Sequence, residues 1–293
     1  MLGKKGRKFA ENVLFISPIF ILYTAFFIIP LVMSFIYSLT DWDGLQKTFN
    51  FIGFNNYINA FMLDKAFINS IKFTFAFTIW GVIAVNLIGL LCALIANMQL
   101  RVSNLVRTFI YLPNVISIIV VGFLWRFMYR SLIPEIGRAL NIDFLQQEFL
   151  TMFNGIVYVI LVPAVWQSAG FIMLIYLAGL QSVPADLIDV MVIDGANAVQ
   201  RFFNLTVPFL MPSFIATAFI TTTGSLKVFD IIVSLTGGGP GKASESLAMN
   251  IYKEGLSTMK YGAGSAKAII YCIIILIITV AQLVYLKSKE VDV

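Results

Sequence analysis

Residues 155–180 read GIVYVILVPAVWQSAGFIMLIYLAGL, a run of 26 residues without one charged side chain. As a helix, a run of this length is about 39 Å long, because each residue adds about 1.5 Å. The hydrocarbon core of a bilayer is about 30 Å thick, so the stretch predicts a membrane-spanning helix. The residues that follow, 181–206, bring in three aspartates and an arginine and do not continue the span.

Other uncharged runs have a similar length. They cover residues 13–39, 73–98, 108–125, 207–226 and 268–286. The shortest, 108–125, is followed by Arg126 and Arg130, whose long side chains can reach the interface. We therefore predict an all-α, polytopic membrane protein with six transmembrane helices. The segment 181–206 is then an internal loop between the fourth and fifth helices.

The composition agrees with a membrane protein. Of 293 residues, 59% are apolar and only 12% are charged, whereas about a quarter of the residues of soluble domains are charged. The net charge of +5 is too small to indicate nucleic-acid binding. Histidine is absent, which excludes Ser-His-Asp and Cys-His catalysis and histidine-bound zinc. The two cysteines lie inside apolar runs, where they pack as small hydrophobic residues.

The basic residues near the ends bear on the orientation. Four of them lie within residues 4–8, directly before the first run, as they also do in a signal peptide. The run 13–39 is about twice as long as a signal core and no small-residue cleavage site follows it, so we expect an uncleaved first helix. Six spans place both termini on one side. The basic start and the lysines of the tail favour the cytoplasm for residues 1–12 and 287–293, although the total Lys and Arg counts do not decide it.

The polar residues of the spans narrow the function. Charges lie only at the ends of the runs, which disfavours an intramembrane hydrolase or a proton relay. Neutral polar groups inside the spans suit an uncharged, hydroxyl-rich solute, since aromatic side chains accompany them. These groups are Asn86, Asn97, Gln167, Ser168, Thr221, Thr222, Thr223, Ser225 and Gln282. The same groups also serve as hydrogen bonds between helices, and that alternative stays open for each of them.

Residues 237–242, GGGPGK, look like a phosphate-binding loop. A P-loop requires glycine where Thr236 stands and serine or threonine where Ala243 stands, and no buried strand precedes this segment. We therefore expect that this chain does not itself bind ATP, and we predict neither a cofactor nor a metal site.

The loop 181–206 has the pattern of two short helices outside the bilayer. Pro184 suits the first helical position, and the charge of Asp186 suits the first turn. Gly195 permits a left-handed turn, after which residues 196–203 can form a second helix. The first helix has an apolar face at helical spacing, formed by Leu187, Val190 and Met191. Such a face fits a groove on a partner protein, or it lies on the lipid surface.

Residues 177–196, LAGLQSVPADLIDVMVIDGA, resemble the signature loop of binding-protein-dependent ABC importer permeases, and more narrowly that of the maltose-type carbohydrate uptake subfamily. The resemblance covers most of the chain. It includes Phe203, Thr206-Val207-Pro208, Pro212, Gly53-Phe54-Asn55-Asn56-Tyr57, Arg107, Leu112-Pro113, Trp125, Trp166, Phe229-Asp230, Leu235-Thr236-Gly237-Gly238-Gly239-Pro240 and Ala263-Gly264-Ser265-Ala266.

This resemblance implies a permease subunit of an ATP-driven importer for a sugar or oligosaccharide, which is not itself an enzyme. It implies a bacterial cytoplasmic membrane protein with both termini in the cytoplasm. The implied partners are a second homologous permease subunit, two ATPase subunits that bind the ATP, and an extracytoplasmic solute-binding protein.

The resemblance also implies which residues act. The cytoplasmic loop would couple to the ATPase through Asp186, Asp189, Val190, Met191, Asp194, Gly195 and Ala196. The sugar contacts implied by the family pattern are Ser168, Phe171, Ser225 and Lys227. Polarity adds Gln167, Thr222 and Thr223. Of these, Lys227 fits an interfacial charge better than a sugar ligand.

One departure stands out, since the family usually has Glu-Ala-Ala where this chain has Asp189-Val190-Met191. We expect docking to persist with an altered fit to the ATPase groove. The alternative function is an ATP-independent channel or secondary transporter for a neutral solute. A secondary transporter is typically built from inverted repeats, and the two halves of this sequence show no such match.

Overall fold

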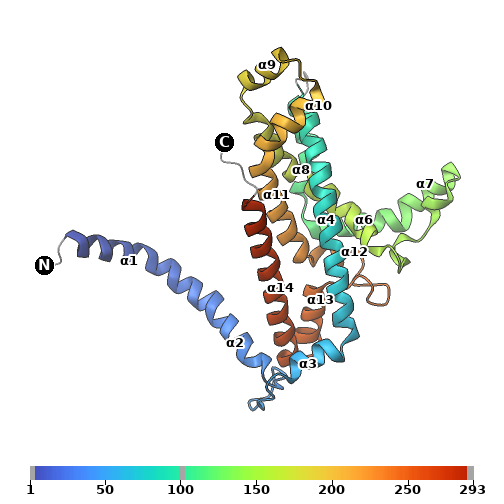
Figure 1. The fold of residues 1–293 in the computed structure, drawn as a ribbon. Coiled ribbons are helices and arrows are strands. Elements are labelled where there is room, and N and C mark those ends of the chain that lie inside the picture. The colour runs from blue at the N-terminus through green and yellow to red at the C-terminus, as the bar shows by residue number, and fades with distance from the viewer. Residues whose placement is uncertain (1–3, 99–102, 289–293) are drawn as a thin grey trace. The chain divides into compact units, whose positions relative to one another are not determined.

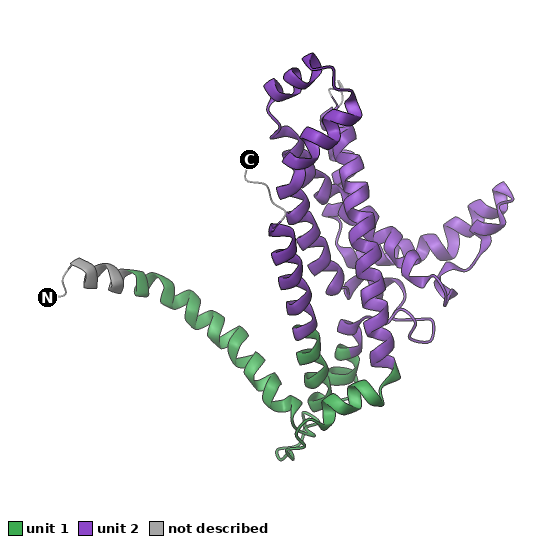
Figure 2. Ribbon diagram, in the orientation of Figure 1, with its two compact units in different colours: residues 1–65, 251–272 green, residues 66–250, 273–293 purple. Residues whose placement is uncertain are grey.

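The computed structural model describes residues 4–98 and 103–288, and within these residues the regular structure is helical, with no β-strand. The predicted all-α class is confirmed. Most of the predicted tail, 287–293, lies outside the described residues, as do the first three residues of the predicted N-terminal segment. The chain divides into two compact units (Figure 2), residues 1–65 with 251–272 and residues 66–250 with 273–293.

Five helical stretches in the described residues are long and apolar enough to cross a membrane. They are Asn12–Ser38, Lys65–Asn97, Ile156–Gln181, Ala198–Leu226 and Tyr261–Lys287. The first contains most of α1 (Lys4–Tyr23), a π-helical turn (Thr24–Ile28) and α2 (Ile29–Ser38). The others contain α4 (Lys65–Asn97), α8 (Ile156–Gln181), α11 (Val207–Leu226) and α14 (Tyr261–Lys287). Each stretch overlaps one of the uncharged runs of the sequence.

The run predicted as the third span, 108–125, is two helices rather than one. Helix α5 (Ser103–Val115) ends within the run, and α6 (Ile118–Phe127) begins three residues later. The chain bends by 93° between α5 and the helical segment that starts with α6. Helix α6 continues through a π-helical turn (Met128–Leu132) into α7 (Ile133–Leu140). Counting this bent pair as one span gives the six that the sequence predicts. Ser117 has an extended backbone (φ −56°, ψ 135°), so the hydrogen-bond ladder stops at the break.

The first unit joins α2, α3 (Asn55–Met62) and the segment 251–272 by polar contacts. Asn56 is buried, and its amide nitrogen donates to the carbonyls of Ser38 at 2.9 Å and Thr40 at 2.7 Å. The backbone of Gly262 lies against Thr40, where a Cβ would collide with the Thr40 carbonyl oxygen. The hydrogen bonds of Asn56 and the close approach at Gly262 are among the contacts that hold these segments together.

The second unit is built around α8. Helices α5 and α11 pack on α8, and α12 (Asp230–Leu235) packs on α6. At the crossing of α5 and α8, Gly170 faces the backbone of Ile110, and a Cβ there would collide with the Ile110 carbonyl oxygen. Two hydrophobic clusters form the core of this unit. One lies around Phe73, Phe77, Tyr129, Ile160 and Ile232, and the other around Val85, Ile172, Met173, Leu177 and Leu210.

Candidate functional site

A cavity of about 310 Å³ lies in the second unit, between α4, the break between α5 and α6, α8, α11 and the start of α12. Both Asn114 and Ile118, one on each side of the break, line it. Irregular backbone at membrane depth is tolerated where it lines a cavity or is buried in protein. The break between α5 and α6 thus forms part of the cavity wall.

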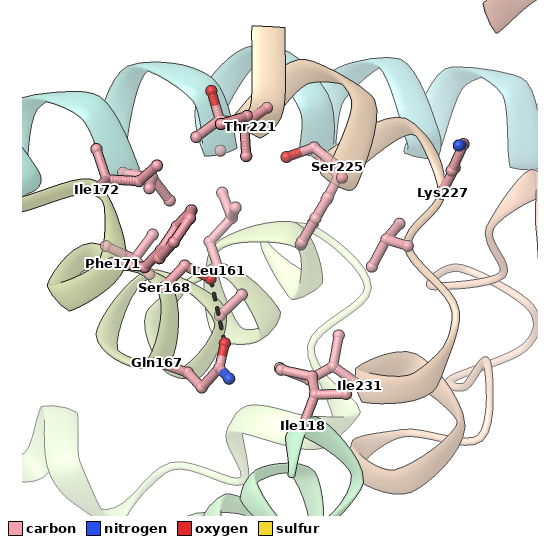
Figure 3. Close-up of a pocket in the computed structure, with 18 of the residues that line it drawn as sticks. Ile118, Leu161, Gln167, Ser168, Phe171, Ile172, Thr221, Ser225, Lys227 and Ile231 are labelled. Atoms are coloured by element: carbon pink, nitrogen blue, oxygen red, sulfur yellow. Dashed lines mark hydrogen bonds between the residues drawn. The ribbon is translucent and has the colours of Figure 1, made fainter. Parts of the chain in front are cut away.

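The cavity wall carries neutral polar groups beside an aromatic ring. Figure 3 shows the ring of Phe171 between Ser168 and Thr221, with the hydroxyl of Ser225 on the neighbouring helix. One cation and one anion, Lys227 and Asp230, also belong to the lining, so the charges of the wall balance. The lysine ammonium points away from Ser168 and Phe171 (Figure 3). This wall can stack an apolar face of a solute and hydrogen-bond its hydroxyls.

The structure brings most of the predicted solute residues together. Gln167, Ser168, Phe171, Ser225 and Lys227 line the cavity. Thr222 and Thr223 do not line it, whereas Thr221 does. Helical spacing explains the difference, because Thr221 lies four residues before Ser225 and shares its face of α11. Thr222 is buried, and the hydroxyl of Thr223 is buried without a hydrogen-bond partner among the described residues.

The side chain of Gln167 supports the break in the helix. Its amide nitrogen donates to the carbonyls of Asn114 at 3.5 Å and Ile116 at 3.4 Å, two carbonyls at the end of α5. Its carbonyl oxygen accepts from the hydroxyl of Ser168 at 3.3 Å. Gln167 therefore directs its donors at the protein backbone, and Ser168 is held in place by Gln167.

A buried hydrogen-bond network adjoins the cavity at Thr221, and the sequence alone does not predict it. It joins Asn86 of α4, Tyr176 of α8, and Thr217 and Thr221 of α11. Asn86 and Thr221 are among the neutral polar residues of the spans, but which faces of the three helices meet depends on their packing. Only Thr221 of the four also lines the cavity.

The loop 181–206 forms two short helices, α9 (Ala185–Ile193) and α10 (Ala198–Arg201). They lie together at the end of the unit where α4 and α8 end (Figure 1). Gly195 joins them with φ +79°, the left-handed conformation that the sequence predicts. A capping box starts α10, since Asn197 accepts from the backbone nitrogen of Gln200 and Gln200 accepts from that of Asn197.

The surface of this helix pair is both acidic and apolar. Asp186, Asp189 and Asp194 are exposed, as are Val190 and Val192, while Met191 and Ala196 are half-buried. The largest exposed apolar residues are Leu187, Ile188, Val190, Val192, Ile193, Val199 and Phe203. A surface of this kind fits either a groove on a partner protein or the lipid surface, the two alternatives that the sequence leaves open.

The chain matches a family model described as the binding-protein-dependent transport system inner membrane component, over residues 85–289. It is 35% identical to the probable starch degradation products transport system permease protein AmyD of Thermoanaerobacterium thermosulfurigenes, over 99% of this chain and 100% of that protein. It is 32% identical to the multiple sugar-binding transport system permease protein MsmF of Streptococcus mutans, over 92% of this chain and 93% of that protein.

A solved structure has the same fold. It is a chain of a bacterial ABC transporter involved in the import of the acidic polysaccharide alginate, with a TM-score of 0.83 and 23% sequence identity. The match covers 96% of each chain. The family model and the near full-length relatives agree with the helical fold, and this chain belongs to the family of binding-protein-dependent transport system inner membrane components.

Proposed function

We propose that this chain is one permease subunit of an ATP-driven importer for an uncharged sugar or oligosaccharide. The observation that carries the proposal is the cavity wall, in which the hydroxyls of Ser168, Thr221 and Ser225 accompany the ring of Phe171 and the two charges balance. A phosphorylated or acidic solute would favour a wall with excess cations. Relatives named for starch degradation products and for multiple sugars support the same class of solute.

The pathway is completed by partners. A second, homologous permease supplies the other half of the translocation path, and an extracytoplasmic solute-binding protein delivers the sugar. Two ATPase subunits bind and hydrolyse the ATP, so this chain needs no cofactor of its own. The match to a binding-protein-dependent family supports this arrangement.

The helix pair α9–α10 is the contact with the ATPase. Its exposed apolar side chains fill a groove on that subunit, and Asp186, Asp189 and Asp194 favour basic residues around it. When the ATPase dimer closes, it pushes on this pair, and α8 and α11 carry the displacement to the cavity. Because the pair must face the ATPase, both chain termini lie in the cytoplasm. Val190 and Met191, larger than the alanines usual at these positions, alter the fit to the groove.

Two measurements test the proposal together. A strain that lacks this gene, complemented with the wild-type chain, is given a panel of ¹⁴C-labelled neutral saccharides from glucose to maltohexaose. The chain with Asp194→Cys is then crosslinked in membranes with a short thiol-to-amine reagent. We expect uptake of at least one saccharide and a crosslink to an ATPase subunit. Uptake that persists without ATP, or crosslinks to phospholipid alone, would point to the channel or secondary transporter instead.

A further inference from the structure

The hydrogen-bond network at Thr221 includes Tyr176, a residue that does not line the cavity. We infer that Tyr176 is a positioning residue: through Asn86 it holds Oγ1 of Thr221 in place, so that Thr221 accepts a hydrogen bond from a hydroxyl group of the solute. This inference rests on the proposed function, since it concerns the same cavity.

The four members of the network are linked at short distances. The hydroxyl of Tyr176 donates to Oδ1 of Asn86 at 2.8 Å. The amide nitrogen of Asn86 donates to Oγ1 of Thr221 at 2.9 Å. On the other side, Oγ1 of Thr217 donates to the hydroxyl of Tyr176 at 2.9 Å. All four residues are at most 8% exposed, so water does not replace these bonds.

Each polar hydrogen on the side chains of Asn86 and Thr221 already has an acceptor within the protein. Asn86 donates one amide hydrogen to Thr221 and the other to the carbonyl of Val82 at 2.8 Å. The hydroxyl hydrogen of Thr221 goes to the carbonyl of Thr217 at 2.7 Å. A hydroxyl oxygen has two lone pairs, and Asn86 occupies one of them. Thr221 therefore offers the cavity an acceptor and no donor.

The Tyr176 hydroxyl and the Val82 carbonyl together fix the amide of Asn86. With the tyrosine hydroxyl as donor, the amide oxygen faces α8 and the amide nitrogen faces α11. Without that donor, Oδ1 of Asn86 is left as a buried acceptor without its hydrogen bond, and the amide nitrogen of Asn86 is held less firmly against Oγ1 of Thr221. The free lone pair of Thr221 is then no longer fixed in position for the solute. The solute group that matches this site is a hydroxyl that donates.

A double-mutant cycle tests the inference with the saccharide that the wild-type chain transports in the panel above. We expect Tyr176→Phe to lower the uptake rate about 5- to 10-fold, in the range of one buried hydrogen bond. Thr221→Val should lower it at least as much, and the double variant should transport as slowly as Thr221→Val alone. Thr221→Ser, which keeps the hydroxyl, should retain most of the uptake. Effects of Tyr176→Phe and Thr221→Val that multiply in the double variant would overturn the inference.

The matched control is Tyr129→Phe. Tyr129 is also buried, and its hydroxyl donates to the carbonyl of Val159 at 3.0 Å, but it does not line this cavity. This variant should lose stability to a similar extent and keep its uptake. Loss of uptake in Tyr129→Phe equal to that in Tyr176→Phe would assign both tyrosines a structural role only, against the inference.

A second readout does not depend on transport. The purified full chain and the same variants are unfolded thermally in lipid nanodiscs, which gives the coupling between Tyr176 and Thr221 directly. Non-additive shifts in Tm support the positioning of Thr221 by Tyr176, and additive shifts overturn it. If the wild-type chain takes up no saccharide, the proposed function fails, while this cycle still decides whether the network orients Thr221.

Discussion

The Nζ of Lys267 lies 2.6 Å from Oδ2 of Asp64, within the first unit. The same ammonium lies 3.2 Å from Oε2 of Glu254. The lysine side chain is only 3% exposed, and the two carboxylates are partly covered. A cation is thus held between two anions where α14 begins, and this contact joins α14 to the segment that follows α3.

Replacing the buried cation should destabilise the chain strongly. Lys267→Met leaves Asp64 and Glu254 without their common counter-charge, and breaking a buried pair in this way costs about 3 kcal/mol or more. Thermal unfolding of the purified chain in nanodiscs measures the loss. Lys260→Met is the control, because Lys260 is 68% exposed and lies 3.7 Å from the same Glu254. An exposed pair contributes at most about 1 kcal/mol, so equal losses for the two lysines would contradict the expectation.

Replacing Gly195 should uncouple transport without unfolding the protein. Proline cannot adopt the φ of +79° found between α9 and α10, so Gly195→Pro displaces the helix pair. We expect normal membrane insertion, measured by immunoblot of membrane fractions, and no saccharide uptake. Gly195→Asn should keep part of the uptake, since asparagine tolerates the left-handed conformation and no other group lies within 4 Å of a Cβ there. Full uptake by Gly195→Pro would count against coupling through this loop.

The ring of Phe171 should contribute to transport rather than to stability. Phe171→Ala removes the aromatic face of the cavity, and we expect roughly 10-fold slower uptake, whereas Phe171→Tyr should retain it. Phe214→Ala is matched in exposure, with 42% against 39%, and Phe214 does not line the cavity. Initial rates of labelled-saccharide uptake, normalised to the amount of chain in the membrane, compare the two. Equal losses would show that the ring acts through general packing.

The loop after α2 should respond to acid through Asp41. The side-chain amide and then the backbone nitrogen of Asn50 donate to this carboxylate, and they lower its pKa below the ordinary value of 3.8. Because the folded pKa is the lower one, the stabilisation is present above about pH 4 and is lost as the pH falls through the folded pKa.

Asn50→Ala should therefore raise the pKa of Asp41 toward 3.8. The carboxyl ¹³C shifts of selectively labelled aspartate report it. Asp43 is the internal reference, since the backbone nitrogens of Gln46 and Leu45 lower its pKa without Asn50. A pKa of Asp41 that does not rise in Asn50→Ala would show that the side-chain amide of Asn50 does not lower it.

The sequence predicts the bounds of the long helices better than it predicts which of their faces line the cavity. The run 155–180 agrees with α8 to within one residue at each end, because charge-free length alone defines a span. The break at residues 116–117 does not follow from charge-free length, although Pro113, which lies just before it, is a residue that kinks or ends helices.

The faces of α11 show the same limit. Three consecutive threonines, 221–223, point to different faces of the helix, so polarity alone does not show which one lines the cavity. Thr221 can be identified only from its position four residues before Ser225, which places both on one face. The network of Asn86, Tyr176 and Thr217 requires the packing of three helices that are up to 135 residues apart in the chain. The left-handed conformation of Gly195 was predictable, because helices commonly end with a glycine in this conformation.

The contact of Gly170 with the Ile110 carbonyl restricts how the pathway can open. A methyl group in place of that hydrogen would already push α5 away from α8. We therefore expect these two helices to move together during a transport cycle. The chain should then bend at the extended backbone of Ser117, where the helical hydrogen bonds stop.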